Sequence, residues 1–282
     1  MTNIDLHVHT TASDGRLTPA ELVRRAHEIG VEVLSVADHD TIAGLPETFA
    51  TAAALGVRMV PGVEFGIDID GTEVHMLGYF FDPDDAELQA KLTELHDSRV
   101  GRGRRIVDKL NALGVPLSWD RVQEIAGDGS VGRPHVARGL IEGGFVASHD
   151  EAFQRYLAHG RPAYEEHMKL APEDCIALVH RAGGVALLAH PTWLADAEAV
   201  LPSLVAAGLD GIETYYGNYD EATIRWIEGL ARKYHLVRSG GSDFHGLETS
   251  MHADLGSVSV PDECFAELEA CAGRRQTAAG RR

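Results

Sequence analysis

Residues 4–9 read Ile4-Asp5-Leu6-His7-Val8-His9 and alternate strictly between apolar and polar side chains. This alternation predicts a β-strand with Asp5, His7 and His9 on one face. His7 and His9 are two residues apart, so their rings lie side by side at the carboxyl end of the strand. Two adjacent imidazoles suit one divalent cation. A solvated polar strand face is the alternative, and this motif alone does not decide between them.

Strand and helix patterns alternate through most of the remaining chain. The capping box Thr18-Pro19-Ala20-Glu21 predicts the start of a helix that ends at Gly30. Further helices are expected over residues 45–55, 175–182, 200–207 and 222–234, and strands over residues 31–37, 57–60, 73–77, 185–189, 211–213 and 236–239. Repeated βα units predict an α/β fold with a parallel sheet, here long enough to close into a barrel.

The middle of the chain differs, because residues 84–161 contain helical patterns and no convincing strand. Leu88, Leu92 and Leu95 recur there at helical spacing. We therefore expect a helical insert of residues 84–161 that contributes to substrate binding and emerges from a barrel of residues 1–83 and 162–282. Residues 273–282 are small, polar and basic and are expected to fray.

Composition restricts the class of protein. Hydrophobic residues make up 44% of the 282 residues, which is ordinary for a globular enzyme, and no run reaches the roughly 18 apolar residues of a membrane span. The formal net charge of −18 disfavours long duplex nucleic acid as a partner. The N-terminus leaves no room for a signal peptide, and about 10 Å of helical rise separates Cys264 from Cys271, too far for a disulfide. These features favour a cytoplasmic protein without a membrane partner, and they leave its oligomeric state open.

Potential metal ligands accompany nearly every predicted strand. They are His7, His9, Asp14, His39, Glu64, His75, His190, Asp243 and His245. The carboxyl ends of barrel strands converge on the face where barrel enzymes place their chemistry. Chance supplies one or two such residues, whereas this set is hard to explain as core histidines.

Mixed imidazole and carboxylate ligands suit manganese, iron or zinc better than calcium. Glu64 is the candidate for a carboxylate that bridges two ions. Such a cluster lowers the pKa of bound water to about 7 and thereby supplies hydroxide for attack on a phosphate ester. No G-x-S-x-G or P-loop pattern points to a different mechanism.

Five segments resemble the successive motifs of the polymerase and histidinol phosphatase (PHP) family, within the amidohydrolase superfamily. They read DLHVHT over residues 5–10, ADHDT over 37–41, PGVE over 61–64, LAHP over 188–191 and GSDFH over 241–245. The resemblance covers essentially the whole chain. It implies a distorted (β/α)7 barrel that holds two or three divalent metal ions, with Mn²⁺ expected first and Fe²⁺ or Zn²⁺ as alternatives.

The resemblance also implies which ligands share an ion. The three implied sets are His7, His9, Glu64 and Asp243; Glu64, His75 and His190; and Asp14, His39 and His245. Asp40 follows a ligand, and it either orients His39 from outside or caps the next helix.

Arginines concentrate in the predicted insert. Arg99 and Arg102 share a helix face that suits a phosphate group, although a solvated basic face is the alternative. Arg133 and His135 stand at a helix start and suit anion capture there, with a plain helix start as the alternative. Lys169 is a further candidate for binding the same anion.

This arginine pattern resembles one branch of the PHP family, small bacterial phosphoesterases that act on nucleotides. The resemblance implies removal of the 3′-phosphate from a 3′,5′-bisphosphonucleotide such as pAp, which yields AMP and phosphate. The alternatives are a 5′→3′ exoribonuclease acting on short 5′-phosphorylated RNA, a histidinol-phosphate phosphatase, and a non-catalytic nucleotide or metal sensor. Carbon–nitrogen hydrolysis is disfavoured, because related barrels often use a lysine ligand and no predicted strand end offers one.

Overall fold

The computed structural model describes residues 2–69, 71–127, 129–166, 168–217, 219–246 and 253–280. The strands of this part of the chain hydrogen-bond in chain order: β1 (Ile4–Val8), β2 (Val33–Val36), β3 (Arg58–Ile69), β4 (Thr72–Tyr79), β5 (Val185–Leu188), β6 (Gly211–Tyr216) and β7 (Val237–Gly241). The helices that accompany the sheet are α1 (Pro19–Glu28), α2 (Leu45–Leu55), α7 (Pro172–Arg181), α8 (Ala197–Ala207), α9 (Glu221–Tyr234) and α10 (Asp262–Ala279). The predicted order of βα units is therefore present.

The sheet is mixed, so the expectation of a parallel sheet is wrong at one strand. β1, β2 and β3 pair in parallel, as do β5, β6 and β7, whereas β4 is antiparallel to both β3 and β5. The reason is the short connection after β3: the chain turns back at Gly71, whose φ of 81° costs a glycine little. A parallel neighbour requires a crossover of a dozen or more residues.

The length of β3 corrects a second expectation. β3 continues to Ile69, so Glu64 lies within a strand rather than at its end. The antiparallel ladder with β4 extends the strand, since it pairs Glu64 with Leu77 and runs on to Ile69 and Thr72. Glu64 is therefore flanked on both sides: its backbone N–H donates to the Asp38 carbonyl at 3.2 Å and its carbonyl accepts from the Asp40 N–H at 2.9 Å, while Leu77 of β4 lies opposite it.

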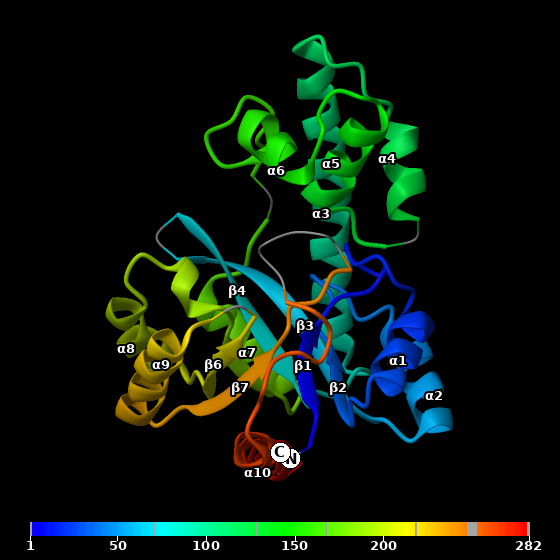
Figure 1. The fold of residues 1–282 in the computed structure, drawn as a ribbon. Helices are drawn as coiled ribbons and strands as arrows, with labels where there is room; N and C mark the ends of the chain where they lie inside the picture. The colour runs from blue at the N-terminus through cyan, green and yellow to red at the C-terminus, as the bar shows by residue number, and fades with distance from the viewer. Residues whose placement is uncertain are drawn as a thin grey trace.

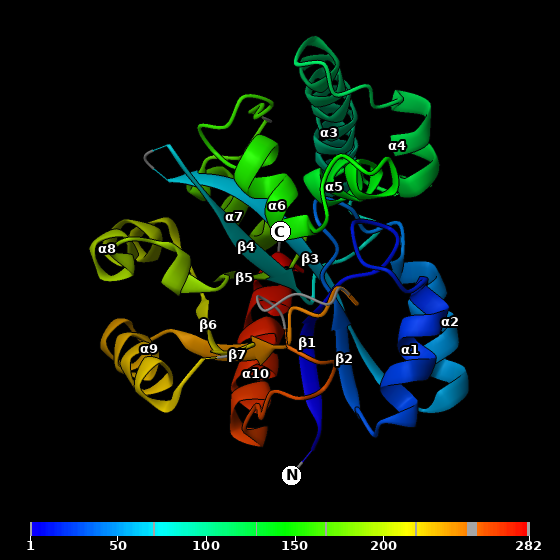
Figure 2. The same cartoon turned by 45° about the horizontal axis from the view of Figure 1, so that its top comes forward.

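The sheet curls until its last strand approaches its first (Figures 1 and 2). Val8 bridges Phe244 just beyond β7, and the backbone N–H of His9 donates to the carbonyl of Phe244 at 2.9 Å. Gly241 permits this closure, because a Cβ at that position would lie 2.4 Å from the backbone nitrogen of His7. The prediction of a distorted (β/α)7 barrel is confirmed.

Helices α1 and α2 cover one side of the barrel and α8 and α9 the other, while α10 lies at the end of the sheet away from the helices between β4 and α7 (Figure 1). The Thr18 side chain and Glu21 form the predicted capping box of α1. The expectation that residues 273–282 fray is wrong up to Ala279, because α10 continues to that residue. Arg275 holds it there by donating to Asp210 at 2.7 Å.

Residues between β4 and α7 form helices above the sheet (Figure 1). They are α3 (Ala86–Ala112), α4 (Trp119–Ala126), α5 (Arg133–Glu142), α6 (His149–Ala152) and the π-helical turn η1 (Phe153–Leu157). They share their own apolar cluster, which includes Ile106, Val136 and Leu157. The first half of α3 instead packs into the main core through Leu88 and Leu95, so α3 joins the two regions.

Among the described helices, none combines the length and apolarity that a bilayer crossing requires. Cys175, Cys264 and Cys271 are buried free thiols, as the spacing of the last two predicts.

Candidate active site

The nine predicted ligands come together at one end of the barrel, and we call them the ligand cluster. Within the described residues, three overlapping groups have ligand atoms that all lie within 4.8 Å of one another. The groups are His7, His9, Glu64 and Asp243; His9, Asp14, His39 and His245; and His39, Glu64 and His75. The first group equals one implied set, and the second contains another.

Glu64 stands between two groups of histidines. Its Oε2 lies 3.3 Å from Nε2 of both His7 and His9. Its Oε1 lies 2.8 Å from His75 Nδ1 and 3.0 Å from His190 Nε2, and these two nitrogens are 3.2 Å apart. The two carboxylate oxygens thus face different ligands, which is the arrangement that a carboxylate bridging two ions requires.

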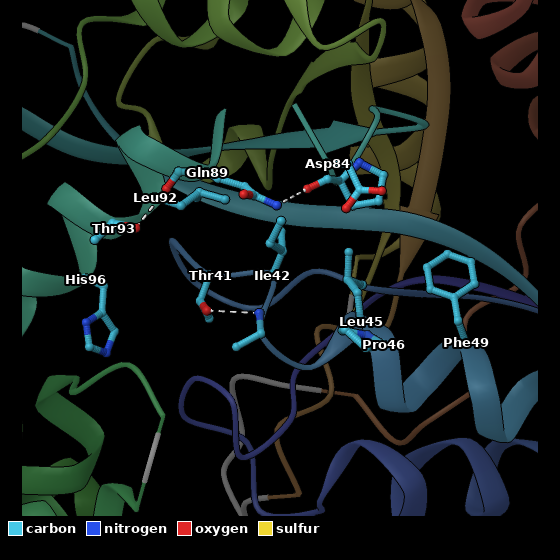
Figure 3. Close-up of a pocket in the computed structure, with 12 residues that line it drawn as sticks. Thr41, Ile42, Leu45, Pro46, Phe49, Asp84, Gln89, Leu92, Thr93 and His96 are labelled. Atoms are coloured by element: carbon cyan, nitrogen blue, oxygen red, sulfur yellow. Dashed lines mark hydrogen bonds between the residues drawn. The ribbon is translucent and has the colours of Figure 1, made fainter. Parts of the chain in front are cut away.

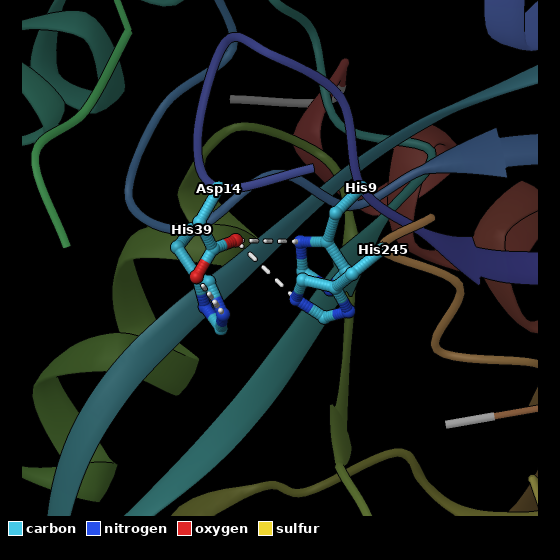
Figure 4. Close-up of side chains that lie close together, drawn as sticks. All are labelled: His9, Asp14, His39 and His245. Carbon is cyan, nitrogen blue, oxygen red and sulfur yellow. Dashed lines mark ion pairs between the residues drawn. The ribbon is translucent and has the colours of Figure 1, made fainter. Parts of the chain in front are cut away.

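The Asp14 carboxylate lies close to three histidines, His9, His39 and His245 (Figure 4). It lies 3.3 Å from His245 Nε2, 3.8 Å from His39 Nε2 and 4.0 Å from His9 Nδ1. The rings of His9 and His245 are stacked with centroids 4.0 Å apart. This part of the ligand cluster depends on loops, because Asp14 and His245 lie outside the strands.

The donor atoms of the ligand cluster fit divalent cations. His7 Nε2, His9 Nε2, His39 Nδ1 and Glu64 Oε2 are buried and form no hydrogen bond of good geometry within the described residues, because they face one another and Asp243. Orphaned buried polar atoms are costly unless something satisfies them. Two ligands about 2.1 Å from one ion, at octahedral or tetrahedral angles, lie about 3.0–3.4 Å apart, and the His7–Glu64 and His9–Asp243 separations of 3.3 and 3.0 Å match this spacing.

Backbone geometry also marks this end of the barrel. Asp40, His190 and Asp243 have positive φ values of 52°, 23° and 53°. Non-glycine residues rarely adopt this region, and such strain persists only where the surroundings enforce it. It turns the chain sharply just after a strand, which brings the following side chains over the end of the barrel.

Electrostatics in the ligand cluster favour bound positive charge. Burial lowers the pKa of His9, but the carboxylates of Asp243 and Glu64 outweigh it and raise the pKa to about 10. Burial likewise raises the pKa of Glu64, yet His75 and His39 hold it well below its usual range. Glu64 therefore remains ionised, and without metal ions a proton on His9 supplies part of the compensating charge.

Several supporting residues escaped the sequence prediction. Glu213 in β6 accepts a hydrogen bond from His7 Nδ1 at 2.8 Å and from the backbone of His190 at 2.8 Å. Tyr216 donates to Asp243 Oδ2 at 2.8 Å. Partners of this kind fix the orientation of metal-binding side chains. Glu213 ends a predicted strand, so the signal that selected the other acids was also available for it.

Asp38 braces the loop that carries Asp14. It accepts hydrogen bonds from the Thr10 backbone and from the hydroxyl groups of Thr10 and Ser13, at 2.6–2.8 Å. Asp38 lies in the ADHDT segment, in which the sequence predicted site roles only for His39 and Asp40.

Three predicted arginines line the space in front of the ligand cluster, and we call Arg99, Arg102 and Arg133 the arginine wall. They border a cavity of about 210 Å³, the inner cavity, together with His39, His75 and His245. Arg99 and Arg102 lie on α3, and Arg133 begins α5. An anion in the inner cavity faces both the arginine wall and the ligand cluster.

Arg102 is the member of the arginine wall that has a hydrogen-bond donor unused by the described residues. Its Nε donates to the carbonyl of Glu165 at 2.8 Å, while its buried Nη2 has no hydrogen-bond partner among the described residues. Burial, and then the proximity of Arg133, lowers the pKa of Arg102 to about 10. Its guanidinium therefore stays charged at neutral pH and retains one unused donor.

The other predicted residues have different surroundings. Asp40 accepts from Arg99 Nε at 2.5 Å and from the Gly66 backbone at 3.1 Å, so it connects β3 with α3. The Nδ1 of His135 accepts from the backbone N–H of Gly132 at 2.9 Å, which suits a helix start.

Lys169 is not brought to the inner cavity. It pairs with Asp68 at 3.0 Å near the end of β3, and it is absent from the residues that line the cavity.

A roomier hollow of about 550 Å³ lies away from the ligand cluster, between α2 and the start of α3 (Figure 3). It is lined by Thr41, Ile42, Ala43, Leu45, Pro46, Phe49, Pro83, Asp84, Gln89, Leu92, Thr93 and His96. The site is assigned to the inner cavity despite its smaller volume, because the ligand cluster and the arginine wall face it.

Comparison with known proteins finds one matching family and relatives named for two activities on nucleic acids and nucleotides. A family model described as the PHP domain matches residues 5–101. A 5′-3′ exoribonuclease of Haemophilus influenzae is 35% identical over 268 residues, which cover 91% of this chain and 96% of that protein. A 3′,5′-nucleoside bisphosphate phosphatase of Chromobacterium violaceum is 33% identical over 280 residues, covering 96% of this chain and 98% of that protein.

A solved structure extends the similarity to the whole fold. It is that of a Bifidobacterium adolescentis protein assigned to the metal-dependent phosphoesterases, with 29% sequence identity and a TM-score of 0.87. The match covers 95% of this chain and 96% of that chain, so the helices above the barrel belong to the shared architecture.

Proposed function

The chain belongs to the PHP family of metal-dependent phosphoesterases, and from this premise we propose that it removes the 3′-phosphate from 3′,5′-bisphosphonucleotides such as pAp. The observation that carries the proposal is that one cavity has the ligand cluster on one side and the arginine wall on the other. A substrate with two phosphates matches these two sites.

We propose that the nine residues hold two or three divalent ions. The proposed sets are His7, His9, Glu64 and Asp243; Glu64, His75 and His190; and Asp14, His39 and His245, with Mn²⁺ as the ion and Fe²⁺ or Zn²⁺ as alternatives. Divalent ions at such a site lower the pKa of a water molecule and neutralise charge on a phosphoryl group.

The chain's own residues orient the substrate. Arg102 offers the unused Nη2 donor, and Arg133 carries a second guanidinium on the same wall. Charge-assisted hydrogen bonds of this kind fix a phosphate with geometric specificity. The distal 5′-phosphate bound there keeps the 3′-phosphate in front of the ligand cluster.

Residues 84–161 act in this proposal as a substrate-binding insert. Arg99, Arg102 and Arg133 all come from its helices α3 and α5. Arg99 has an additional role, because its pairing with Asp40 ties the insert to the barrel. His135 and Lys169 remain weaker candidates, since Gly132 and Asp68 already engage them.

A 5′→3′ exoribonuclease acting on short 5′-phosphorylated RNA is the second candidate. A further space of about 390 Å³, the outer hollow, shares Glu73, His75, Arg133 and Trp193 with the inner cavity. This continuity leaves room for a substrate longer than a mononucleotide. The relative from Haemophilus influenzae carries the name of this activity.

The test is phosphate release by the manganese-loaded protein from four compounds assayed side by side: pAp, AMP, a 5′-phosphorylated dinucleotide and histidinol phosphate. We expect fast turnover of pAp and little of AMP. Cleavage of the dinucleotide at a comparable rate supports the exoribonuclease. Fast turnover of histidinol phosphate without turnover of pAp contradicts the proposal, and no release from any compound favours a nucleotide or metal sensor.

A further inference from the structure

Trp193 occupies an unusual place beside the proposed active site. It ends the short 3₁₀ helix η2 (Pro191–Trp193), directly after His190. Its ring centroid lies 3.8 Å from that of His190, yet the side chain remains 44% exposed. Trp193 lines both the inner cavity and the outer hollow. A large aromatic side chain is therefore presented to solvent where the two spaces meet.

The outer hollow has further aromatic rings. His159 and Tyr164 line it, with ring centroids 5.1 Å apart in an edge-to-face arrangement. The guanidinium of Arg133 lies 6.0 Å from the centroid of Tyr164, within the range of a cation–π contact. The described wall of the outer hollow thus combines flat aromatic faces with the Arg133 guanidinium and its partner Glu73, whereas the inner cavity is lined mostly by charged and proposed metal-binding groups.

This combination is the one that single-stranded nucleotides require. Aromatic side chains stack on bases, and adjacent cationic groups take the phosphates. A volume of about 390 Å³ falls within the range of sites for small organic ligands. Arg133 borders both spaces, so a phosphate at the arginine wall is directly next to a group that enters the outer hollow.

We propose that the outer hollow binds the nucleobase of the substrate and that Trp193 is the stacking platform for it. The proposal rests on the nucleotide activity proposed above and adds a residue that determines specificity. Because every base has a π-face, stacking on Trp193 accepts purines and pyrimidines alike. Substrates with different bases are therefore expected to differ little, while a substrate without a base is expected to bind poorly.

Trp193 also packs against His190, a proposed ligand, so a substitution could act through that contact alone. Two substrates separate the explanations: pAp, and ribose 3,5-bisphosphate, which has the same two phosphates and no base. A disturbed His190 slows both substrates in proportion. Loss of a base platform affects only pAp and lowers the preference for it.

The experiment measures kcat/KM for both substrates in the wild type, Trp193→Ala, Trp193→Phe and Trp226→Ala. Trp226 is a matched control, since it lies on α9 and is 42% exposed. We expect the wild type to prefer pAp by about tenfold or more. Trp193→Ala is expected to abolish most of this preference, Trp193→Phe to retain most of it, and Trp226→Ala to leave it unchanged. A wild type that treats both substrates alike, or an equal loss on both in Trp193→Ala, overturns the proposal.

A binding measurement keeps this test independent of the proposed activity. If the wild type releases phosphate from neither substrate, the bisphosphatase proposal fails, and the platform is then tested by calorimetric titration with AMP. We expect AMP to bind Trp193→Ala about tenfold more weakly than the wild type or Trp226→Ala. Equal affinities overturn the platform.

Discussion

The ligand cluster and the arginine wall face the same cavity but originate from different parts of the chain. Strands β1, β3 and β4 and the segments after other strands supply the ligand cluster, whereas helices α3 and α5 supply the wall. Both regions hold buried polar atoms without a hydrogen-bond partner among the described residues, but their chemistry is opposite: the ligand cluster offers imidazole and carboxylate atoms such as His7 Nε2 and Glu64 Oε2, and the wall offers the Nη2 donor of Arg102. In the proposed function, the barrel therefore supplies the chemistry and the insert selects the substrate.

Glu64→Gln is expected to have the largest effect, because it removes the charge that faces both groups of histidines. We expect phosphate release from pAp to fall by about 10³-fold or more, since bound ions contribute several kcal/mol. The metal content of the purified protein, measured by mass spectrometry, is expected to fall in parallel. Glu47→Gln alters an exposed carboxylate on α2 and serves as the control. Full activity of Glu64→Gln contradicts the assignment of this residue.

Asp40→Asn tests the connection between the two regions. Asp40 and Arg99 form a buried ion pair, and removal of one partner from such a pair costs about 3 kcal/mol or more. We expect the free energy of unfolding, measured with denaturant, to fall by about that amount.

The matched control for this connection is Asp68→Asn. Its pair with Lys169 leaves the Asp68 side chain 40% exposed, so the expected loss is about 1 kcal/mol or less. Similar small losses in both variants mean that the Asp40–Arg99 pair does not hold the insert to the barrel.

Arg102→Ala separates substrate selection from chemistry. A hydrogen bond to a charged group contributes about 1.5–3 kcal/mol, so kcat/KM for pAp is expected to fall about 10- to 100-fold. For 3′-AMP, which lacks the 5′-phosphate, the expected loss is smaller. Arg104→Ala, on the exposed side of α3, is the control. Equal losses on pAp and 3′-AMP show that Arg102 does not recognise the distal phosphate.

Proton release on metal binding is the smallest expected effect. The pKa of His9 is raised to about 10 in the metal-free protein, so His9 carries a proton at pH 7 that an incoming ion must displace. The stabilisation from this proton is fully present below the unfolded pKa of about 6.5 and is lost as the pH rises toward 10. We therefore expect metal ions to bind more tightly as the pH rises.

Calorimetry at pH 7 in two buffers with different ionisation heats measures this release. We expect about one proton or more per chain, and fewer protons in His9→Gln. Binding heats that do not depend on the buffer contradict a protonated His9.

Sequence patterns predicted the barrel and the positions of the ligand cluster because both depend on short-range geometry. The alternation at His7 and His9 fixes a strand face, and strand ends of a barrel converge whatever the connections between them. The reversal of β4 was missed because a turn of two residues differs little in composition from a longer loop. Glu64 was consequently placed at a strand end, although its position in the cavity does not depend on that error.

Interactions between elements far apart in the sequence could not be predicted from the sequence patterns. The Asp40–Arg99 pair and the contact of Arg102 with the Glu165 carbonyl depend on how α3 packs on the barrel. Trp193 gave no periodic signal, since it stands in a short 3₁₀ turn. Helical spacing showed which arginines share a face but not which pocket that face meets.

The most direct test of the central claim is a crystal structure of the manganese-loaded protein with AMP, analysed by anomalous diffraction. The account predicts anomalous peaks between Glu64 and its histidine neighbours, with the 5′-phosphate of AMP against Arg102 and Arg133. Absence of manganese from the ligand cluster, or a 5′-phosphate bound away from the arginine wall, contradicts it.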